Sequence, residues 1–320
     1  MKRILLIQTA FLGDVILATP VLSELKRLFP DAQIDVLVKK GNESLLENHL
    51  AVQTIYTLDK KSGKRAAIRS LIAQFRKNHY DLVLNLHRFG SSGWIAGRSG
   101  GKRRYGFKKN PFSFLYTKRF PHCIGDGTHE VTRNLSLIQE FGAEQLVRPS
   151  LFPSSEDEKC SEQYRTDSYV CIAPTSVWFT KQMPKEKWLE LIAKLPAKRI
   201  YLLGGPEDAA YCDELRTEAG SLEVINLAGQ LSLLASAALM RDAEHNYVND
   251  SGPMHLASAM NAPTTAFFCS TIPNFGFGPL AEGAVIREVN GLDCRPCGLH
   301  GHRSCPKGHF KCGLEIDVTP

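Results

Sequence analysis

The sequence contains no uninterrupted apolar run of about 20 residues, the length that crosses a bilayer as a helix. Its N-terminal apolar run is interrupted by Gln8 and Asp14, and no small-residue cleavage site follows, which argues against a secretory signal. We therefore expect a cytoplasmic protein without a membrane span. A length of 320 residues favours two domains, and 43% hydrophobic with 22% charged residues is typical of a globular protein.

The first predicted strand also lacks the loop sequences that mark common nucleotide sites. Neither G-x-G-x-x-G nor a Walker A sequence follows Ile4–Ile7, which argues against dinucleotide and P-loop binding. Instead, Gly13 and Asp14 precede an amphipathic helix that we expect to extend to Phe29. In an α/β protein this position opens onto the ligand crevice. Asp14 can cap the helix, accept hydroxyl hydrogen bonds or take a proton there, and the residues alone leave these roles open.

Short β-type runs alternate with helical stretches along most of the chain, a rhythm that predicts parallel sheets covered by helices. A polar segment with two prolines, residues 148–168, interrupts the rhythm, which then restarts. We therefore predict two Rossmann-like domains, residues 1–150 and 165–320, with a substrate cleft between them.

Polar residues in the second half follow predicted strands and should therefore share one edge of a sheet. The candidates are Thr175, Ser176, Lys181, Asp208, Asp250, Ser251, Gly252, Pro253, Met254 and His255. A helix opened by Ser251-Gly252 offers free N–H groups and a positive dipole end, and with Lys181 nearby we expect a diphosphate. Individually, Asp250 and Ser251 could serve only as helix caps. In the same way, Lys181 could be a solvated surface residue and His255 a core histidine.

Acidic residues are missing from residues 98–119, which hold eight lysines and arginines with aromatic residues between them. Such a segment is either a solvated loop or a surface for an anionic substrate, a membrane or a nucleic acid. No nucleic-acid-binding module is recognisable, so we expect no nucleic-acid partner.

Four of the nine cysteines cluster near the C-terminus, with three histidines among them. They are Cys294, Cys297, Cys305 and Cys312, spaced C-x2-C-x7-C-x6-C. The spacing is compatible with a structural zinc site, although the second pair lacks the tight spacing of a zinc ribbon or finger. Disulfide pairing and free thiols remain alternatives, and we expect no catalytic metal.

Three segments together resemble glycosyltransferase family 9, the ADP-heptose:lipopolysaccharide heptosyltransferases. They are LIQTAFLGDVILATPVLSELKRLFP at residues 6–30, HRFGSSGWIAGRSGGKRRYGF at 87–107 and NDSGPMHLASAMNAPTTAFF at 249–268. The run CPKGHFKC at 305–312 is similar to the second heptosyltransferase subgroup. The resemblance extends along nearly the whole chain.

The resemblance implies a GT-B fold, in which two Rossmann-like domains face each other across a cleft and bind acceptor and nucleotide sugar respectively. It implies inverting transfer of heptose from ADP-heptose to the inner core of lipopolysaccharide, with no cofactor and no metal. The acceptor would be an anionic glycolipid, Kdo-lipid A or a heptosylated core. A basic surface would hold the enzyme peripherally at the cytoplasmic face of the inner membrane.

The resemblance also implies residue roles. Asp14 matches the general base, and Lys181 matches the lysine that contacts the donor phosphates. Residues 250–255 match the loop that binds pyrophosphate and sugar through backbone amides. Thr175 and Ser176 fall on a phosphate-binding pair, and Asp208 matches an acidic residue that holds the ribose. Candidates for the acceptor's anionic groups are Arg88, Arg98, Lys102, Arg103 and Arg104.

The sequence departs from the family pattern at two places. Residues 270–280 replace a shorter turn, and the chain end differs as well. Thr319-Pro320 is a helix-start signal that no helix follows, so we expect either a truncated chain or a different closure. Three alternatives remain open. The first is a GT-B transferase with another nucleotide-sugar donor. The second is an oxidoreductase or nucleotide-sugar epimerase, and the third is a non-catalytic binding module organised by zinc.

Overall fold

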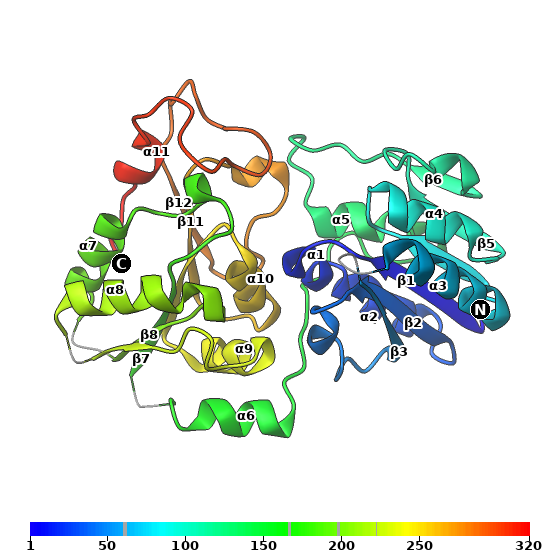
Figure 1. The fold of residues 1–320 in the computed structure, drawn as a ribbon, viewed down its shortest axis with the longest axis horizontal. Coiled ribbons are helices and arrows are strands. Elements are labelled where there is room, and N and C mark those ends of the chain that lie inside the picture. The colour runs from blue at the N-terminus through cyan, green and yellow to red at the C-terminus, as the bar shows by residue number, and fades with distance from the viewer. Residues whose placement is uncertain (60–62, 166–167, 197–198, 222) are drawn as a thin grey trace. The chain divides into compact units, whose positions relative to one another are not determined.

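The computed structural model describes residues 1–59, 63–165, 168–196, 199–221 and 223–320. Its contacts divide the chain into two compact units (Figure 1). The first unit is Met1–Ile124 with Thr128–Phe152, and the second is Pro153–Pro320 with Gly125–Gly127. Gly125–Gly127 belongs to the second unit because it is bonded to Asn274 there. The Asn274 side chain donates to the Gly125 carbonyl at 3.0 Å, and Gly127 N–H donates to the Asn274 carbonyl at 3.3 Å.

The described residues of the first unit form a parallel sheet with strand order β3-β2-β1-β4-β5-β6. Its strands are β1 Arg3–Gln8, β2 Gln33–Lys39, β3 Val52–Leu58, β4 Leu82–Asn85, β5 Arg103–Phe107 and β6 Lys118–Phe120. β1 and β4 are almost wholly apolar and buried, as strands covered on both faces require. The strand order reverses between β1 and β4, where such sheets bind ligands at their carboxyl edge.

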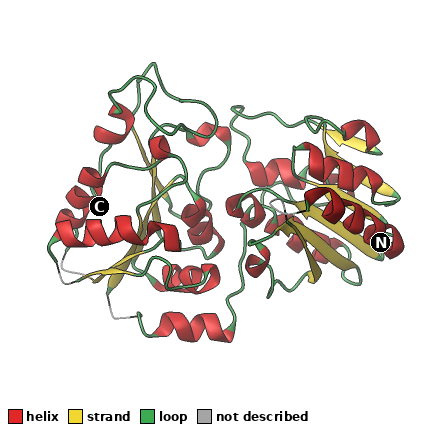
Figure 2. Ribbon diagram, in the orientation of Figure 1, coloured by secondary structure: helices red, strands yellow, loops and turns green. Residues whose placement is uncertain are grey.

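Helices cover the sheet of the first unit (Figure 2). They are α1 Leu12–Ile16, α2 Thr19–Leu28, α3 Lys64–Asn78, α4 Gly90–Arg98 and α5 Glu130–Leu135, with 3-10 turns η1 Glu43–Leu45, η2 Ser113–Leu115 and η3 Gln139–Phe141. The single helix predicted up to Phe29 is wrong in detail, because it is divided after α1 and restarts with Pro20 in the first turn of α2. Phe75 of α3 and Ile95 of α4 pack on Leu5 and Val83 of the sheet.

The second unit repeats the arrangement, with parallel strands in the order β12-β11-β10-β7-β8-β9 among the described residues. Its strands are β7 Tyr169–Ala173, β8 Arg199–Leu202, β9 Val224–Asn226, β10 His245–Asn249, β11 Thr264–Phe268 and β12 Val285–Glu288. Read from its other edge, this order matches that of the first unit. The strand order reverses here between β7 and β10, which predicts a ligand site at their carboxyl ends.

The helices of the second unit enclose a core that includes the C-terminal segment. They are α6 Ser155–Glu162, α7 Lys185–Lys194, α8 Ala209–Ala219, α9 Leu233–Asp242, α10 Gly252–Ala259 and α11 Lys311–Leu314, with 3-10 turns η4 Phe179–Lys181, η5 Pro206–Asp208 and η6 Pro273–Phe275. Trp188 of α7 packs edge-on against Phe267 of β11. Ile316 and Val318 are buried in the same core. Within the described residues, no helix has the length and apolar character to cross a membrane.

The segment predicted as an interdomain connection contains α6, which sequence inspection missed because the segment is so polar. Ser154 caps the helix, because its hydroxyl accepts the Asp157 N–H at 3.1 Å while the Asp157 carboxylate accepts the Ser154 N–H at 2.9 Å. The Ser232 hydroxyl, just before α9, donates to the same Asp157 at 2.6 Å. The polar residues thus fix α6 to the second unit.

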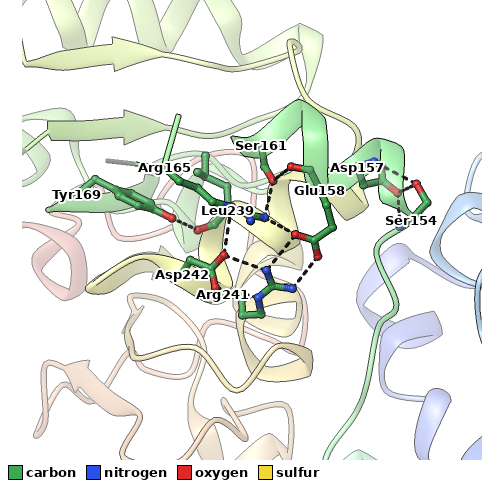
Figure 3. Close-up of polar contacts among 9 residues, drawn as sticks. All are labelled: Ser154, Asp157, Glu158, Ser161, Arg165, Tyr169, Leu239, Arg241 and Asp242. Atoms are coloured by element: carbon green, nitrogen blue, oxygen red, sulfur yellow. Dashed lines mark hydrogen bonds and ion pairs between the residues drawn. The ribbon is translucent and has the colours of Figure 1, made fainter. Parts of the chain in front are cut away.

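Ion pairs complete the attachment of α6 (Figure 3). Glu158 accepts hydrogen bonds from Arg241 of α9 at 2.7 Å and from Arg165 at 2.5 Å. The bonds from Arg241 are the main reason that the pKa of Glu158 falls to about 2, although partial burial opposes the shift. Arg165 also pairs with Asp242 at 3.1 Å, so the network closes around the end of α9.

Candidate active site

Asp14 lies in the first turn of α1, directly after β1, at the carboxyl edge of the first sheet. One of its carboxylate oxygens accepts the N–H of Phe11, the residue that precedes the helix, at 3.2 Å. Asp14 therefore contributes to capping without being the cap residue itself. Its other oxygen stays available, so capping and chemistry do not compete.

The surroundings of Asp14 make its carboxyl group a stronger base than an ordinary aspartate. Burial is the largest cause, followed by the negative charge of Glu130, and together they raise the pKa of Asp14 to about 6. The Phe11 N–H and the positive charge of Arg88 oppose this shift. At neutral pH the carboxylate is ionised and holds the proton affinity that a general base requires.

Glu130, the first residue of α5, is buried and ionised. His122 Nε2 lies 3.1 Å from each of its carboxylate oxygens, and Arg133 donates to it at 2.9 Å. Burial raises the pKa of Glu130, but the hydrogen bonds and charges of His122 and Arg133 outweigh it, so the pKa is lowered overall. Glu130 was not selected from the sequence, because nothing local signals that it lies near Asp14.

Buried polar side chains occupy the point where the strand order of the first sheet reverses. They are Gln8, Thr9, Asn85 and His87, which lie at or just beyond the ends of β1 and β4. The Thr9 hydroxyl lies 2.9 Å from His87 Nδ1, which links the ends of the two strands. The next residue, Arg88, is near enough to Asp14 to lower its pKa, so the structure brings these two predicted site residues together.

The other four residues predicted for the acceptor lie away from Asp14. Lys102 and Arg103 stand at the start of β5, and Lys102 pairs with Asp81 at 2.8 Å at that amino edge of the sheet. Arg104 donates to two nearby backbone carbonyls, and Arg98 at the end of α4 stacks on a tryptophan at 4.8 Å. Basic residues that are close together in the sequence therefore lie at opposite ends of a helix or strand. The sequence of a contiguous basic run does not reveal this separation.

Two lysines that were not selected from the sequence occupy the edge where Asp14 lies. Lys108 and Lys109 directly follow β5 and are exposed. The Lys108 N–H donates to the carbonyl of Phe120, the last residue of β6, at 2.8 Å, which fixes the turn. Because parallel strands end on one edge, these cations share it with Arg88.

In the second unit, Lys181 and Asp250 form an ion pair at 2.8 Å, with Asp250 almost fully buried. Thr271, in the loop after β11, donates to the same carboxylate oxygen at 2.5 Å. Asn249 connects the loops, because its side-chain oxygen accepts the Met183 N–H at 2.9 Å. The loops after β7, β10 and β11 thus meet around Lys181.

The N-terminus of α10 follows β10 directly and retains unused polar groups. Ser251 precedes the helix in an extended conformation, but its hydroxyl forms no capping bond and is shielded from solvent without a hydrogen-bond partner in the described chain. Pro253 has no N–H, and Met254 N–H donates to the Ser251 carbonyl at 3.2 Å. Since Met254 and His255 are also buried, the backbone around Ser251 and Gly252 is the part available to an anion.

The remaining predicted donor residues also lie at the carboxyl edge of the second sheet. Thr175 and Ser176 follow β7 and are partly exposed, and Ser176 N–H donates to the Gln182 side chain at 3.2 Å. Asp208 follows β8, where its carboxylate accepts the Gly205 N–H at 2.8 Å. The loops after β7 and β8 therefore hold these three residues near the point where the strand order reverses.

Arg295, which sequence analysis did not single out, fixes the loop after β11. Its buried guanidinium donates to the carbonyls of Phe268, Cys269 and Thr271 at 2.6–3.1 Å, and to Glu288 at 2.6 Å. The following segment packs on the Lys181 loop, because the His302 N–H donates to the Thr180 hydroxyl at 2.8 Å. Gly301 (φ +78°) has no room for a side chain there, since a Cβ would lie 2.9 Å from Thr180 Oγ1 and 3.0 Å from Lys181 Cγ.

The four clustered cysteines, for which the sequence left zinc binding, disulfide pairing and free thiols open, lie near one another, since burial and then the neighbouring Cys297, Cys305 and Cys294 raise the pKa of Cys312. Across the described ranges, no three His, Cys, Asp or Glu side chains are grouped so that they could hold a metal ion. Cys312 is buried in the hydrophobic core, while Cys294 Sγ lies 3.9 Å from His309 Nε2. The segment packs against the Lys181 loop through Gly301 and His302.

A sequence model described as Glycosyltransferase family 9 (heptosyltransferase) matches residues 68–306. The chain belongs to glycosyltransferase family 9. The predicted recognition, GT-B fold and enzyme class are therefore confirmed, and the protein is a glycosyltransferase. Neither an oxidoreductase nor a non-catalytic binding module is consistent with this membership.

Individual family 9 members cover most of the chain. Lipopolysaccharide heptosyltransferase 3 of Escherichia coli K12 is 29% identical over 284 residues, covering 81% of this chain and 80% of that protein. Lipooligosaccharide heptosyltransferase 2 of Haemophilus ducreyi is 28% identical, covering 99% and 96%. The structure of E. coli ADP-heptose LPS heptosyltransferase II has a TM-score of 0.79 at 23% identity, covering 93% and 96%, and shows the same fold.

The pKa of Asp14 predicts how stability depends on pH. The folded-state value of about 6 exceeds the ordinary 3.8, so above pH 6 the ionised group opposes folding, and this cost vanishes below about pH 4, where both states are protonated. We expect Asp14→Asn to stabilise the first unit by roughly 1 kcal/mol at pH 8, allowing for partial solvent exposure, and to be neutral below pH 4. Urea unfolding at both pH values measures this.

Asp81→Asn is the matched control, because the hydrogen bond from Lys102 lowers the pKa of Asp81. This replacement should have the opposite sign and destabilise the protein at pH 8. A destabilising Asp14→Asn at pH 8 would contradict the raised pKa of Asp14.

Proposed function

We propose that this enzyme transfers heptose from ADP-heptose to the inner core of lipopolysaccharide, with inversion and without a metal. The proposal depends on one observation: the partly buried carboxylate of Asp14 lies at the strand reversal of the first sheet and has a raised pKa. The chain that carries it belongs to family 9. The names of the relatives, which include ADP-heptose and lipopolysaccharide, support the donor and the acceptor. We assign the acceptor to the first domain, residues 1–150, and the donor to the second.

In the proposed reaction an acceptor hydroxyl attacks the anomeric carbon of the donor from the face opposite ADP. The new bond joins the acceptor oxygen to that carbon, while the bond from the carbon to the phosphate oxygen breaks and its electron pair leaves with ADP. Asp14 takes the hydroxyl proton as the bond forms. Attack opposite the leaving group inverts the configuration of the anomeric carbon.

The charge that develops on ADP requires cations and N–H groups aimed at it. Lys181 has three donors, so it can keep its bond to Asp250 and still reach a phosphate. The backbone N–H groups at Ser251 and Gly252 supply neutral donors beside it. Residues Thr175 and Ser176 extend this phosphate site, and Asp208 is assigned to the ribose.

For the acceptor's anionic groups we propose Arg88, Lys108 and Lys109. All three follow strands of the first sheet at the edge where Asp14 lies. Lys102, Arg103 and Arg104 belong to the opposite edge and are already used in local contacts, so we assign them to the stability of the sheet.

We also propose peripheral contact with the cytoplasmic face of the inner membrane, through an aromatic ridge formed by Phe89, Trp94, Phe112 and Phe114. Trp94 contacts Phe112 at 5.2 Å between ring centroids, and Phe114 lies 6.2 Å from Phe112. Phe89 and Phe114 are 63% and 68% exposed. The nearby cations Arg98, Lys108 and Lys109 form no ion pair with the described residues. Exposed rings beside unpaired cations fit an anionic lipid surface.

Replacing Asp14 by asparagine tests the general base. We expect turnover to fall by about 10²–10⁴-fold with ADP affinity unchanged, because the proton acceptor is lost while the assigned donor site is intact. Initial rates with ADP-heptose and a heptose-deficient core acceptor measure this, with the exposed Asp31→Asn as control. Unchanged turnover in Asp14→Asn would refute the assigned role, and a product with retained anomeric configuration would refute inversion.

Lys181→Ala tests the donor site. Loss of a charge-assisted bond to the diphosphate should weaken ADP binding by about 10–100-fold. Calorimetric titration of ADP, with UDP and GDP for comparison and with EDTA present, measures it. Lys187→Ala is the control, since Lys187 pairs with Glu190 on α7. Undiminished ADP affinity in Lys181→Ala would refute the phosphate assignment, and tighter binding of UDP or GDP would refute the donor.

Vesicle binding tests the aromatic ridge. We expect sedimentation with vesicles containing phosphatidylglycerol and little with pure phosphatidylcholine. The double variant Phe112→Ser/Phe114→Ser should bind at least ~10-fold more weakly, because two apolar side chains no longer enter the interface. Leu50→Ser replaces an even more exposed apolar residue outside the ridge and should bind normally. Equal binding to both vesicle types would contradict the proposal.

A further inference from the structure

A buried cluster of charged side chains lies in the first unit beside Asp14 and has no role in the reaction described so far. Glu130 at its centre keeps only 6% of its side chain exposed, and its two partners His122 and Arg133 are enclosed as well. The His122 ring packs edge-on against Phe107 at 4.5 Å between centroids. A buried ion cluster of this kind is seldom a source of stability, because desolvation offsets the attraction of the charges. It therefore calls for a functional explanation.

The helix that carries Glu130 is attached to the segment that carries Asp14. The Asn134 side chain of α5 donates to the carbonyl of Leu17, which ends α1, at 3.3 Å. Farther along the same segment, the Thr19 hydroxyl accepts the Ser150 N–H at 3.0 Å. The first of these bonds ties the helix that carries Glu130 to the end of the helix that carries Asp14.

We propose that Glu130 is a positioning residue of the transfer reaction, whose carboxylate, kept anionic by His122 and Arg133, makes Asp14 a stronger base toward the acceptor hydroxyl. An anion beside Asp14 favours its protonated state, which is the state that Asp14 reaches in the transition state. His122 and Arg133 hold the proton affinity of Glu130 itself low, so only one of the two carboxylates titrates near neutrality.

Other charged or titratable groups lie on the elements around Asp14. Arg88, after β4, lowers the pKa of Asp14, and Lys39, at the end of β2, stands over the ring of Phe11 at 5.8 Å. His129 precedes α5 next to Glu130, and its ring accepts the Val131 N–H at 3.2 Å. Glu130 is thus the one carboxylate among the groups identified around Asp14, and it opposes the effect of Arg88.

The inference rests on Asp14 being the base, and its test is the acid limb of the pH–kcat profile. Wild-type kcat should fall below about pH 6, where Asp14 becomes protonated. In Glu130→Gln the limb should move down by about one pH unit, because the neighbouring anion is gone. The plateau kcat should fall by about three- to tenfold, since a weaker base accelerates the reaction less. Glu130→Asp retains the charge and should keep the limb near its wild-type position.

A merely structural role for Glu130 would lower kcat at every pH and leave the limb in place. An unmoved limb in folded Glu130→Gln therefore overturns the inference. Glu140→Gln is the control, because Glu140 pairs with Lys118 on the surface of the same unit and should not shift the limb. If Asp14→Asn itself keeps full turnover, the general-base assignment fails, which is a separate result.

Loss of one partner from a buried ion cluster can prevent folding. The double variant Glu130→Gln/Arg133→Met removes both opposite charges together and should be tolerated better. Thermal unfolding and ADP titration establish that either variant is folded. The double variant should again show an acid limb at lower pH, and a limb at the wild-type position overturns the inference in the same way.

Discussion

Parallel strand pairing is the constraint on which this molecule depends. When every strand of a sheet runs the same way, all the following loops leave from one edge, and residues far apart in sequence become neighbours. In the first unit, Asp14 after β1 meets Arg88 after β4. In the second unit, Lys181 after β7 meets Asp250 after β10 and Thr271 after β11. Both sets lie where the strand order reverses.

The two units differ in how they arrange their buried charged side chains. The first places two carboxylates close together, so that burial and repulsion raise the proton affinity of Asp14 while His122 and Arg133 keep Glu130 ionised. The second neutralises its buried Asp250 with Lys181 and leaves the Ser251 hydroxyl without a hydrogen-bond partner among the described residues. Glycosyl transfer needs a base that takes up a proton and a cationic site that stabilises a leaving diphosphate.

The central strands of both sheets were predictable because their apolar runs are buried on both faces. Helix α6 was not, because its polar residues are satisfied by Arg241 and Ser232, which lie about 80 residues farther along the chain. The candidate donor loops lie where the sequence placed them, after β7, β8 and β10. The contiguous basic run was misleading, since Lys102 and Lys108 are separated by β5 and lie at opposite edges of the sheet.

The sequence by itself determined the alternation of strands and helices, the absence of dinucleotide and P-loop motifs, and the segments by which family 9 is recognised. These are local properties, written in side-chain periodicity and short motifs. Only the tertiary structure decided that Glu130 lies near enough to Asp14 to raise its pKa and that Arg295 fixes the Thr271 loop. Those facts depend on distances between segments remote in sequence, and no local pattern encodes such distances.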